Sequence, residues 1–199
     1  MITAIFCILP YASPGAQHFF VSQMWLVIVC AVVSLVLACV IVCATNLARK
    51  VPTNYILLLA FTICEAYLVA FACAIVGDGK VVLAAAFLTA AVVVALTLYA
   101  VFTKTDFTAC GGIITVLGAS FFVVGIFAFA FGRTMMLVYD LLGVVVFGIY
   151  LVFDTQYIVG GTGRKHHLNR DDYILGSLML YLDIINLFLH LLSLLSNRN

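Results

Sequence analysis

Six long apolar stretches constrain this chain more than any other feature of its sequence. A helix that crosses a bilayer needs about 20 mostly apolar residues, because it rises about 1.5 Å per residue. The polar joints between the stretches are short, so neighbouring helices must run antiparallel and leave no room for a second domain. We predict an all-α membrane protein built as one bundle. The predicted spans are residues 22–45, 54–76, 80–102, 110–131, 136–158 and 173–195.

The composition supports lipid as the solvent of this bundle. The chain is 66% hydrophobic and 9% charged, whereas a soluble domain carries about 25% charged residues. A net charge of +1 also argues against a nucleic-acid partner, because phosphate binding requires a dense basic patch. We expect an integral membrane protein whose main partner is the lipid bilayer.

Neither catalysis nor tight metal binding is expected. The seven cysteines form no CxxC pair and have no histidines at ligand spacing, so we interpret them as small apolar side chains. GxSxG and HExxH motifs are missing, as is the GxGD context that intramembrane aspartyl proteases carry around their aspartates. We predict a protein that is not an enzyme and has neither a cofactor nor a tightly bound metal.

The first twenty residues differ from the rest of the chain. Residues 2–9 are apolar but too short to span a bilayer, and Pro10, Pro14 and Gly15 follow them. The residues alone leave two alternatives, an interfacial segment or the end of a longer helix. We expect a helix end followed by a loop over residues 1–20, and a six-helix membrane domain over residues 21–199.

Ionisable side chains inside the predicted spans mark the candidate functional site. A carboxylate at membrane depth costs on the order of 2.5–3.5 kcal/mol on insertion scales, so it is a functional hypothesis by default. In the last span, polar residues recur every three or four positions, which places them on one helix face. They are Asp183, Asn186, His190 and Ser193.

Asp154 in the preceding span can meet Asp183, although the spacing does not require it. Asp154 lies about 9 Å from Gly160 and Asp183 about 16 Å from Asp172, so the two helices must be offset. Two adjacent carboxyl groups in a low-dielectric site avoid ionising together, and they share a proton. Protonated, the pair ties two helices together; deprotonated, it pushes them apart or attracts Ca²⁺. Alternatively, each aspartate separately fixes helix packing.

Two further carboxylates lie within the predicted spans. Glu65, one turn after Thr62, either completes the polar interior or is structural. Asp140 lies near the predicted start of its span, where a carboxylate complements the helix dipole. We therefore interpret Asp140 as structural.

Four segments resemble the transmembrane Bax inhibitor motif family, in its Lifeguard branch. Two of them carry the aspartates, FDTQ at 153–156 and LMLYLDIINLFL at 178–189. The other two are FTICEA at 61–66 and TKTDFT at 103–108. The resemblance covers about residues 20–195, and the aspartate-bearing segments are its most specific part.

The resemblance implies a seven-helix bundle with a central aspartate pair that matches Asp154 and Asp183. It implies a pH-sensitive calcium-leak channel that suppresses apoptosis, with Ca²⁺ as the permeant ion in transient contact with the pair. It places the protein in the endoplasmic reticulum or Golgi, with the plasma membrane as the alternative. Its expected partners are apoptosis regulators or other calcium channels. To the polar residues Glu65, Asn186 and His190 of the predicted spans, the resemblance adds Asp171 near the expected pore mouth, and these four form the expected pore or polar interior.

One departure from the family concerns the amino end. The family has one helix before the six found here, so residues 2–9 resemble the end of a helix of which most is lacking. Two other functions stay open. One is a membrane interaction protein that restrains cell death without conducting ions, and the other is a proton-coupled cation exchanger.

Overall fold

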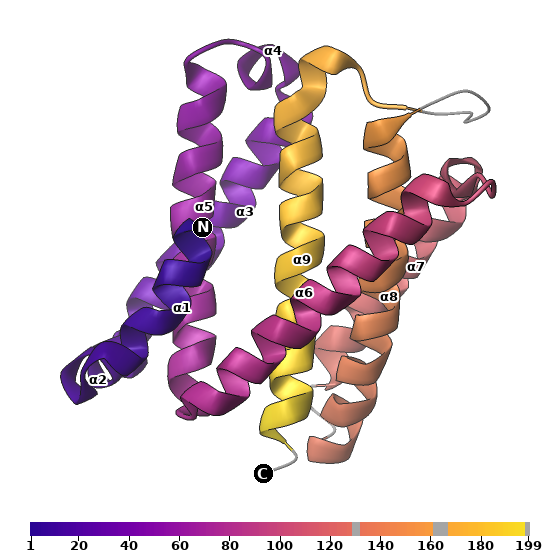
Figure 1. Cartoon of the computed structure of the whole chain (residues 1–199). Coiled ribbons are helices and arrows are strands. Elements are labelled where there is room, and N and C mark those ends of the chain that lie inside the picture. The colour runs from indigo at the N-terminus through magenta and orange to yellow at the C-terminus, as the bar shows by residue number, and fades with distance from the viewer. Residues whose placement is uncertain (129–131, 161–166, 198–199) are drawn as a thin grey trace. The chain divides into compact units, whose positions relative to one another are not determined.

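A computed structural model of the chain describes residues 1–128, 132–160 and 167–197, and this part contains helices but no strand. Six segments are long and apolar enough to cross a membrane, α7 together with the 3-10 turn η1 (Phe107–Cys110) before it (Figure 1). The six-span, all-α prediction is confirmed, although positions 129–131 of the fourth predicted span lie outside the described residues. The long helices are α3 (Met24–Cys43), α5 (Thr53–Val76), α6 (Gly79–Phe102), α7 (Gly111–Ala128), α8 (Arg133–Val159) and α9 (Tyr173–Ser196).

Glycines with positive φ end two of these helices. Gly77 follows α5 with φ 71° and Gly160 follows α8 with φ 61°. Their N–H groups donate to the carbonyl oxygens of Cys73 and Gln156, at 3.2 and 3.0 Å. Because L side chains rarely adopt positive φ, glycine is favoured at both positions, and each helix stops there.

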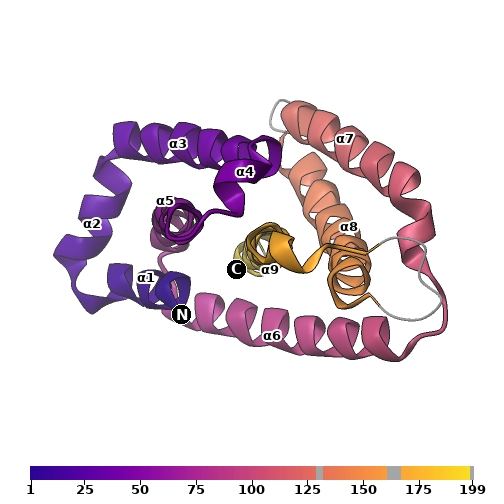
Figure 2. The ribbon, with the colours of Figure 1, turned by 90° about the horizontal axis from the view of Figure 1, so that it is seen from above.

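Residues 1–83 and 170–178 form one compact unit around α5. Figure 2 shows α1 (Ile2–Ala12), α2 (Pro14–Ser22) and α3 arranged about α5. The Tyr11 hydroxyl donates to the Cys73 carbonyl at 2.6 Å, and Gln17 Nε2 donates to the Ala74 carbonyl at 3.1 Å. Burial, with smaller effects of Cys73 and Asp78, raises the pKa of Tyr11 to about 12, so its hydroxyl remains a donor. These bonds tie α1 and α2 to the last turns of α5.

The loop expected within residues 1–20 is in fact a second helix. α1 continues through Pro10 to Ala12, Ser13 is extended, and α2 begins at Pro14. Ser13 Oγ accepts a hydrogen bond from the Ala16 N–H at 3.2 Å. Proline is favoured at the first helical position, where its missing N–H would have no helical partner. Ser13 and Pro14 therefore start a helix, and the expectation of a loop there was wrong.

Polar contacts fasten the start of α9 within this first unit. Arg49, which follows the short helix α4 (Thr45–Ala48), donates to both carboxylate oxygens of Asp172 at 2.7 and 2.8 Å. This bidentate pair raises the pKa of Arg49. Asp172 ends the turn η2 (Arg170–Asp172) that leads into α9. The buried Asn54 side chain donates to the Tyr173 hydroxyl at 2.7 Å, which joins α5 to the first residue of α9.

The second unit comprises the described residues of 84–169 and 179–199. In it α7 and α8 lie side by side (Figure 1). The Tyr150 and Tyr139 hydroxyls occupy the space that a side chain would need at Gly118 and Gly125. The Tyr150 hydroxyl also donates to the Ile114 carbonyl at 2.8 Å. The two glycines of α7 thus admit the tyrosines of α8, as expected of small residues at helix contacts in lipid.

Gln156 fastens the turn between α6 and η1 to α8. Its side chain is fully buried. Its Oε1 accepts from the Phe107 N–H at 2.9 Å. Its Nε2 donates to the carbonyl oxygens of Ala100 and Thr105 at 3.2 and 3.0 Å. One amide side chain therefore serves three backbone groups where the chain turns.

Replacing Gln156 by leucine should destabilise the protein. The change removes three hydrogen bonds, one buried and two partly buried, of about 1 kcal/mol each, which should lower the apparent melting temperature by roughly 6–12 °C. Circular dichroism of the purified protein in detergent measures this shift. Thr115→Val is the control, because Thr115 is exposed on α7 and its hydroxyl donates to the Gly111 carbonyl of its own helix. Equal melting of the two variants would contradict the structural role of Gln156.

Candidate functional site

Asp154 on α8 and Asp183 on α9 bring two carboxyl groups together inside the second unit. The two residues are 4% and 5% exposed, and their side chains lie within hydrogen-bonding reach of each other. Such a contact becomes a hydrogen bond only when one carboxyl group carries a proton. The structure therefore contains the contact between Asp154 and Asp183, which the sequence permitted but did not require.

An offset between the two helices explains how the pair meets. Asp154 lies about 8 Å along α8 from its last residue, Val159, and Asp183 lies about 15 Å along α9 from its first residue, Tyr173. Because these two distances differ, the carboxyl groups can meet only if the helix ends are not level. The sequence identified this requirement, but the joint between the helices did not reveal whether it is met.

The surroundings of the pair leave one carboxylate oxygen available. Within the described residues, Asp183 Oδ2 and Thr155 Oγ1 are buried without a hydrogen-bond partner. Tyr150, one turn before Asp154, lies close enough to interact electrostatically with both carboxyl groups. A buried polar atom without a partner is unfavourable. A proton or a cation at Asp183 would relieve this cost.

The polar face of α9 continues beyond Asp183 to a second site on α8. Asn186 is half-buried, and its Nδ2 donates to the Leu182 carbonyl of its own helix at 2.8 Å. His190 Nδ1 instead lies 2.9 Å from Asp140 Oδ1. The Ser193 hydroxyl donates to the other oxygen, Asp140 Oδ2. We call Asp140, His190 and Ser193 the Asp140 cluster.

The interpretation of Asp140 as a helix-dipole partner was wrong. α8 begins at Arg133 and has no acidic residue in its first turn, so Asp140 lies about two turns inside the helix. Asp140 is only 3% exposed. The prediction failed because it placed the start of the helix near residue 136. The three-residue spacing of His190 and Ser193 was the available signal for a facing carboxylate.

The remaining predicted carboxylates belong to the first unit. Glu65 is half-buried on α5, and its side chain contacts Ser34 on α3. Asp171 is exposed in η2 and interacts electrostatically with Arg49. The proposed contribution of either residue to a pore stays a prediction.

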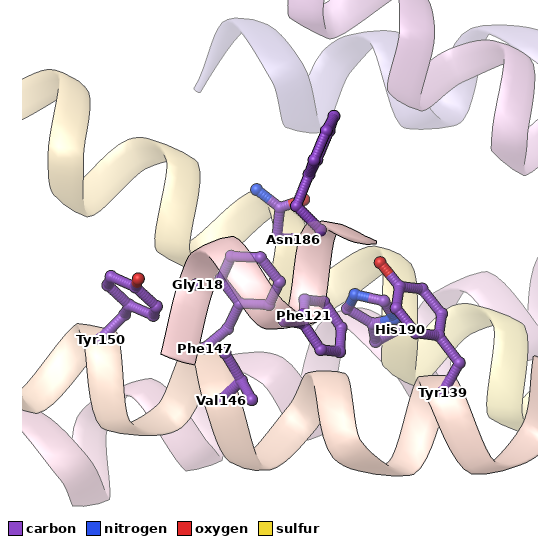
Figure 3. Close-up of a pocket in the computed structure, with 9 residues that line it drawn as sticks. Gly118, Phe121, Tyr139, Val146, Phe147, Tyr150, Asn186 and His190 are labelled. Atoms are coloured by element: carbon purple, nitrogen blue, oxygen red, sulfur yellow. The ribbon is translucent and has the colours of Figure 1, made fainter. Parts of the chain in front are cut away.

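A pocket of about 390 Å³ lies beside the Asp140 cluster in the second unit. Figure 3 shows aromatic side chains gathered around His190. The ring centres of Phe121, Tyr139 and Phe147 lie 5.6, 5.3 and 5.6 Å from that of the imidazole. The sequence did not predict this pocket, because its walls come from three helices whose mutual rotation the apolar pattern leaves open.

The donor groups suit transient contact with a cation. Within the described residues, no three side chains of histidine, cysteine, aspartate or glutamate gather as a potential metal site. A resident Ca²⁺ takes six to eight oxygen ligands, whereas Asp154 and Asp183 offer two carboxyl groups. The transient contact of Ca²⁺ with this pair stays a prediction.

Over residues 1–199 the sequence matches the family described as inhibitor of apoptosis-promoting Bax1. Protein lifeguard 3 of Homo sapiens is 34% identical over 165 residues, which cover 80% of this chain and 52% of that protein. Protein LIFEGUARD 3 of Arabidopsis thaliana is 40% identical over 154 residues, which cover 74% of this chain and 58% of that protein. The chain thus spans little more than half the length of these relatives.

Substitution of Gly143 tests how tightly His190 of the Asp140 cluster packs against α8. A Cβ at this position would lie 2.5–2.6 Å from three atoms of the His190 ring, which the surrounding aromatic rings and Asp140 hold in place. Gly143→Ala should therefore lower the apparent melting temperature by roughly 3–8 °C. At Gly112 on α7, an added Cβ would meet nothing within 4 Å. Gly112→Ala should leave the melting temperature unchanged or raise it, and a similar loss in both variants would refute tight packing at His190.

Proposed function

The chain belongs to the Bax inhibitor/Lifeguard family, and we propose that it is a pH-sensitive calcium-leak channel of an internal membrane that suppresses apoptosis. The chain is an integral membrane protein by its six apolar helices. The proposal rests chiefly on the meeting of Asp154 and Asp183, two buried carboxyl groups on different helices.

Protonation of this pair supplies the proposed gate. When the two carboxyl groups share one proton, a hydrogen bond links α8 to α9. The pair then carries a single negative charge, which attracts a divalent cation only weakly. After the proton leaves, two negative charges face each other in a low-dielectric site. Their repulsion is strong because little water is present to screen it. The helices then move apart, or a cation enters between them. In this scheme the leak increases as the pH rises.

The cellular part of the proposal follows from the leak itself. A calcium leak lowers the content of an internal store, so a death signal releases less calcium from it. The family is described as an inhibitor of apoptosis-promoting Bax1, and we propose the same effect for this chain. We also propose the endoplasmic reticulum or Golgi as its membrane, and apoptosis regulators or other calcium channels as its partners.

Calcium efflux from liposomes that contain the purified chain tests the gate. Between about pH 6 and pH 8 the wild-type flux should rise, because the shared proton is lost over a range set by the pair. Asp183→Asn cannot form a pair of like charges, so its flux should lose most of this pH response. The measurement is the fall in signal of a calcium-sensitive dye trapped inside the liposomes, recorded at a series of external pH values.

Asp78→Asn is the matched control for this experiment. Asp78 is an exposed aspartate in the turn before α6, where it accepts a hydrogen bond from the Lys80 N–H. Its loss should leave the flux and its pH response intact. A folded wild-type protein without flux would favour the interaction protein that restrains cell death without conducting ions. A flux that requires a proton gradient would favour the cation exchanger.

A further inference from the structure

The pocket beside the Asp140 cluster has the composition of a ligand site. Aromatic rings form most of its wall, and its polar groups are few: Asn186 and His190 on α9, and the hydroxyls of Tyr139 and Tyr150 on α8, of which that of Tyr150 already donates to the Ile114 carbonyl. Pockets of this kind bind small molecules through apolar contact and use the few polar groups to fix orientation. The character of those polar groups therefore indicates which ligand the pocket can accept.

Both polar groups from α9 can offer hydrogen-bond acceptors. The amide nitrogen of Asn186 is already used, because it donates to the Leu182 carbonyl, so the oxygen is the end it can offer. With Asp140 as a carboxylate, the His190 Nδ1–H donates to it. The Nε2 of a neutral His190 is then an acceptor as well. A complementary ligand must carry a donor.

The charges around the pocket favour a cation. Asp140 lies directly behind the imidazole and is only 3% exposed. None of the residues that line the pocket, within the described part of the chain, is lysine or arginine. The printed contacts of Asp140 within the described residues are His190 and Ser193, and with His190 in its neutral form neither of them cancels the carboxylate charge, whose potential is poorly screened by water. An anionic ligand would therefore be repelled.

The aromatic wall favours an organic cation over a metal ion. The faces of aromatic rings carry negative charge density and attract ammonium groups within about 6 Å of the ring centre. Phe121 and Tyr139 stack with ring centres 4.4 Å apart, and Phe147 meets Phe121 edge to face at 5.8 Å. These rings line the same pocket as His190 (Figure 3). They suit an apolar body attached to a charged nitrogen.

We propose that this pocket binds a protonated organic amine with an aromatic or alkyl body. The ammonium group donates to His190 Nε2 or to the Asn186 oxygen, while the body of the ligand contacts the rings of Phe121, Tyr139 and Phe147. Amines of this class partition into lipid in their neutral form. Phe122, on the wall of the pocket and 70% exposed, provides an apolar rim on the outer side of α7.

Equilibrium binding to the purified full chain in detergent tests the proposal without reference to calcium flux. The probe is tritiated phenethylamine, which is charged at neutral pH, and the competitor is neutral 2-phenylethanol. The amine should bind saturably and at least about tenfold more tightly than the alcohol, because only the amine carries the charge that the rings and Asp140 attract. Empty detergent micelles measure the non-specific partition of the probe.

Variants identify the groups responsible. Asp140→Asn removes the buried charge, and Phe147→Leu replaces an aromatic face with an aliphatic side chain; each should weaken amine binding roughly tenfold. Thr115→Val, on the exposed face of α7, should bind as the wild type does. If Asp140→Asn fails to fold, as judged by its melting curve, Phe147→Leu still decides the question. Equal affinity for amine and alcohol, absence of saturable amine binding, or wild-type affinity in folded Phe147→Leu would overturn the proposal.

Discussion

The cost of a polar group without a partner in an apolar bilayer governs this structure more than any other constraint. Lipid offers no hydrogen bonds, so backbone and side-chain polar groups must satisfy one another within the protein. Gln156 shows the solution, because its amide serves three backbone groups at a turn. Asp140 shows the same solution for a carboxylate, because one of its oxygens contacts the His190 imidazole and the other accepts from the Ser193 hydroxyl. Asp183 departs from it, since its Oδ2 has no partner within the described residues.

This contrast separates two kinds of buried carboxylate on the same pair of helices. Asp140 is as buried as Asp154 and Asp183, so burial alone does not distinguish them. The difference lies in their partners. Both oxygens of Asp140 already have a partner within the protein, an imidazole and a hydroxyl. Two carboxyl groups that face each other cannot be satisfied in their ionised form, and only a proton or a cation completes them.

The sequence predicted the features that depend on one helix at a time. Apolar length located all six spans, and the three- and four-residue spacing placed Asp183 and His190 on one face of α9. Features that depend on two helices were less accessible. The contact of His190 with Asp140 was missed because the predicted start of α8 was three residues too late. Asp140 was therefore taken for a residue near the helix start. The aromatic pocket needs the mutual rotation of α7, α8 and α9, which uniformly apolar surfaces leave undetermined. The loop predicted around Ser13 and Pro14 was wrong for a different reason, because proline ends some helices and begins others.

The two polar contacts between α8 and α9 also differ in what they demand of the helices. At the Asp140 cluster, Gly143 leaves room for the His190 ring against the backbone of α8, so that end of the contact is close and sterically specific. At the other end, Asp154 and Asp183 are joined only while a proton is shared. Repulsion between them would therefore act on helices that remain fastened at His190, and the motion it produces is a change of angle about that point. The proposed gate needs one fixed contact and one that titrates; the Asp140 cluster would supply the first and the aspartate pair the second.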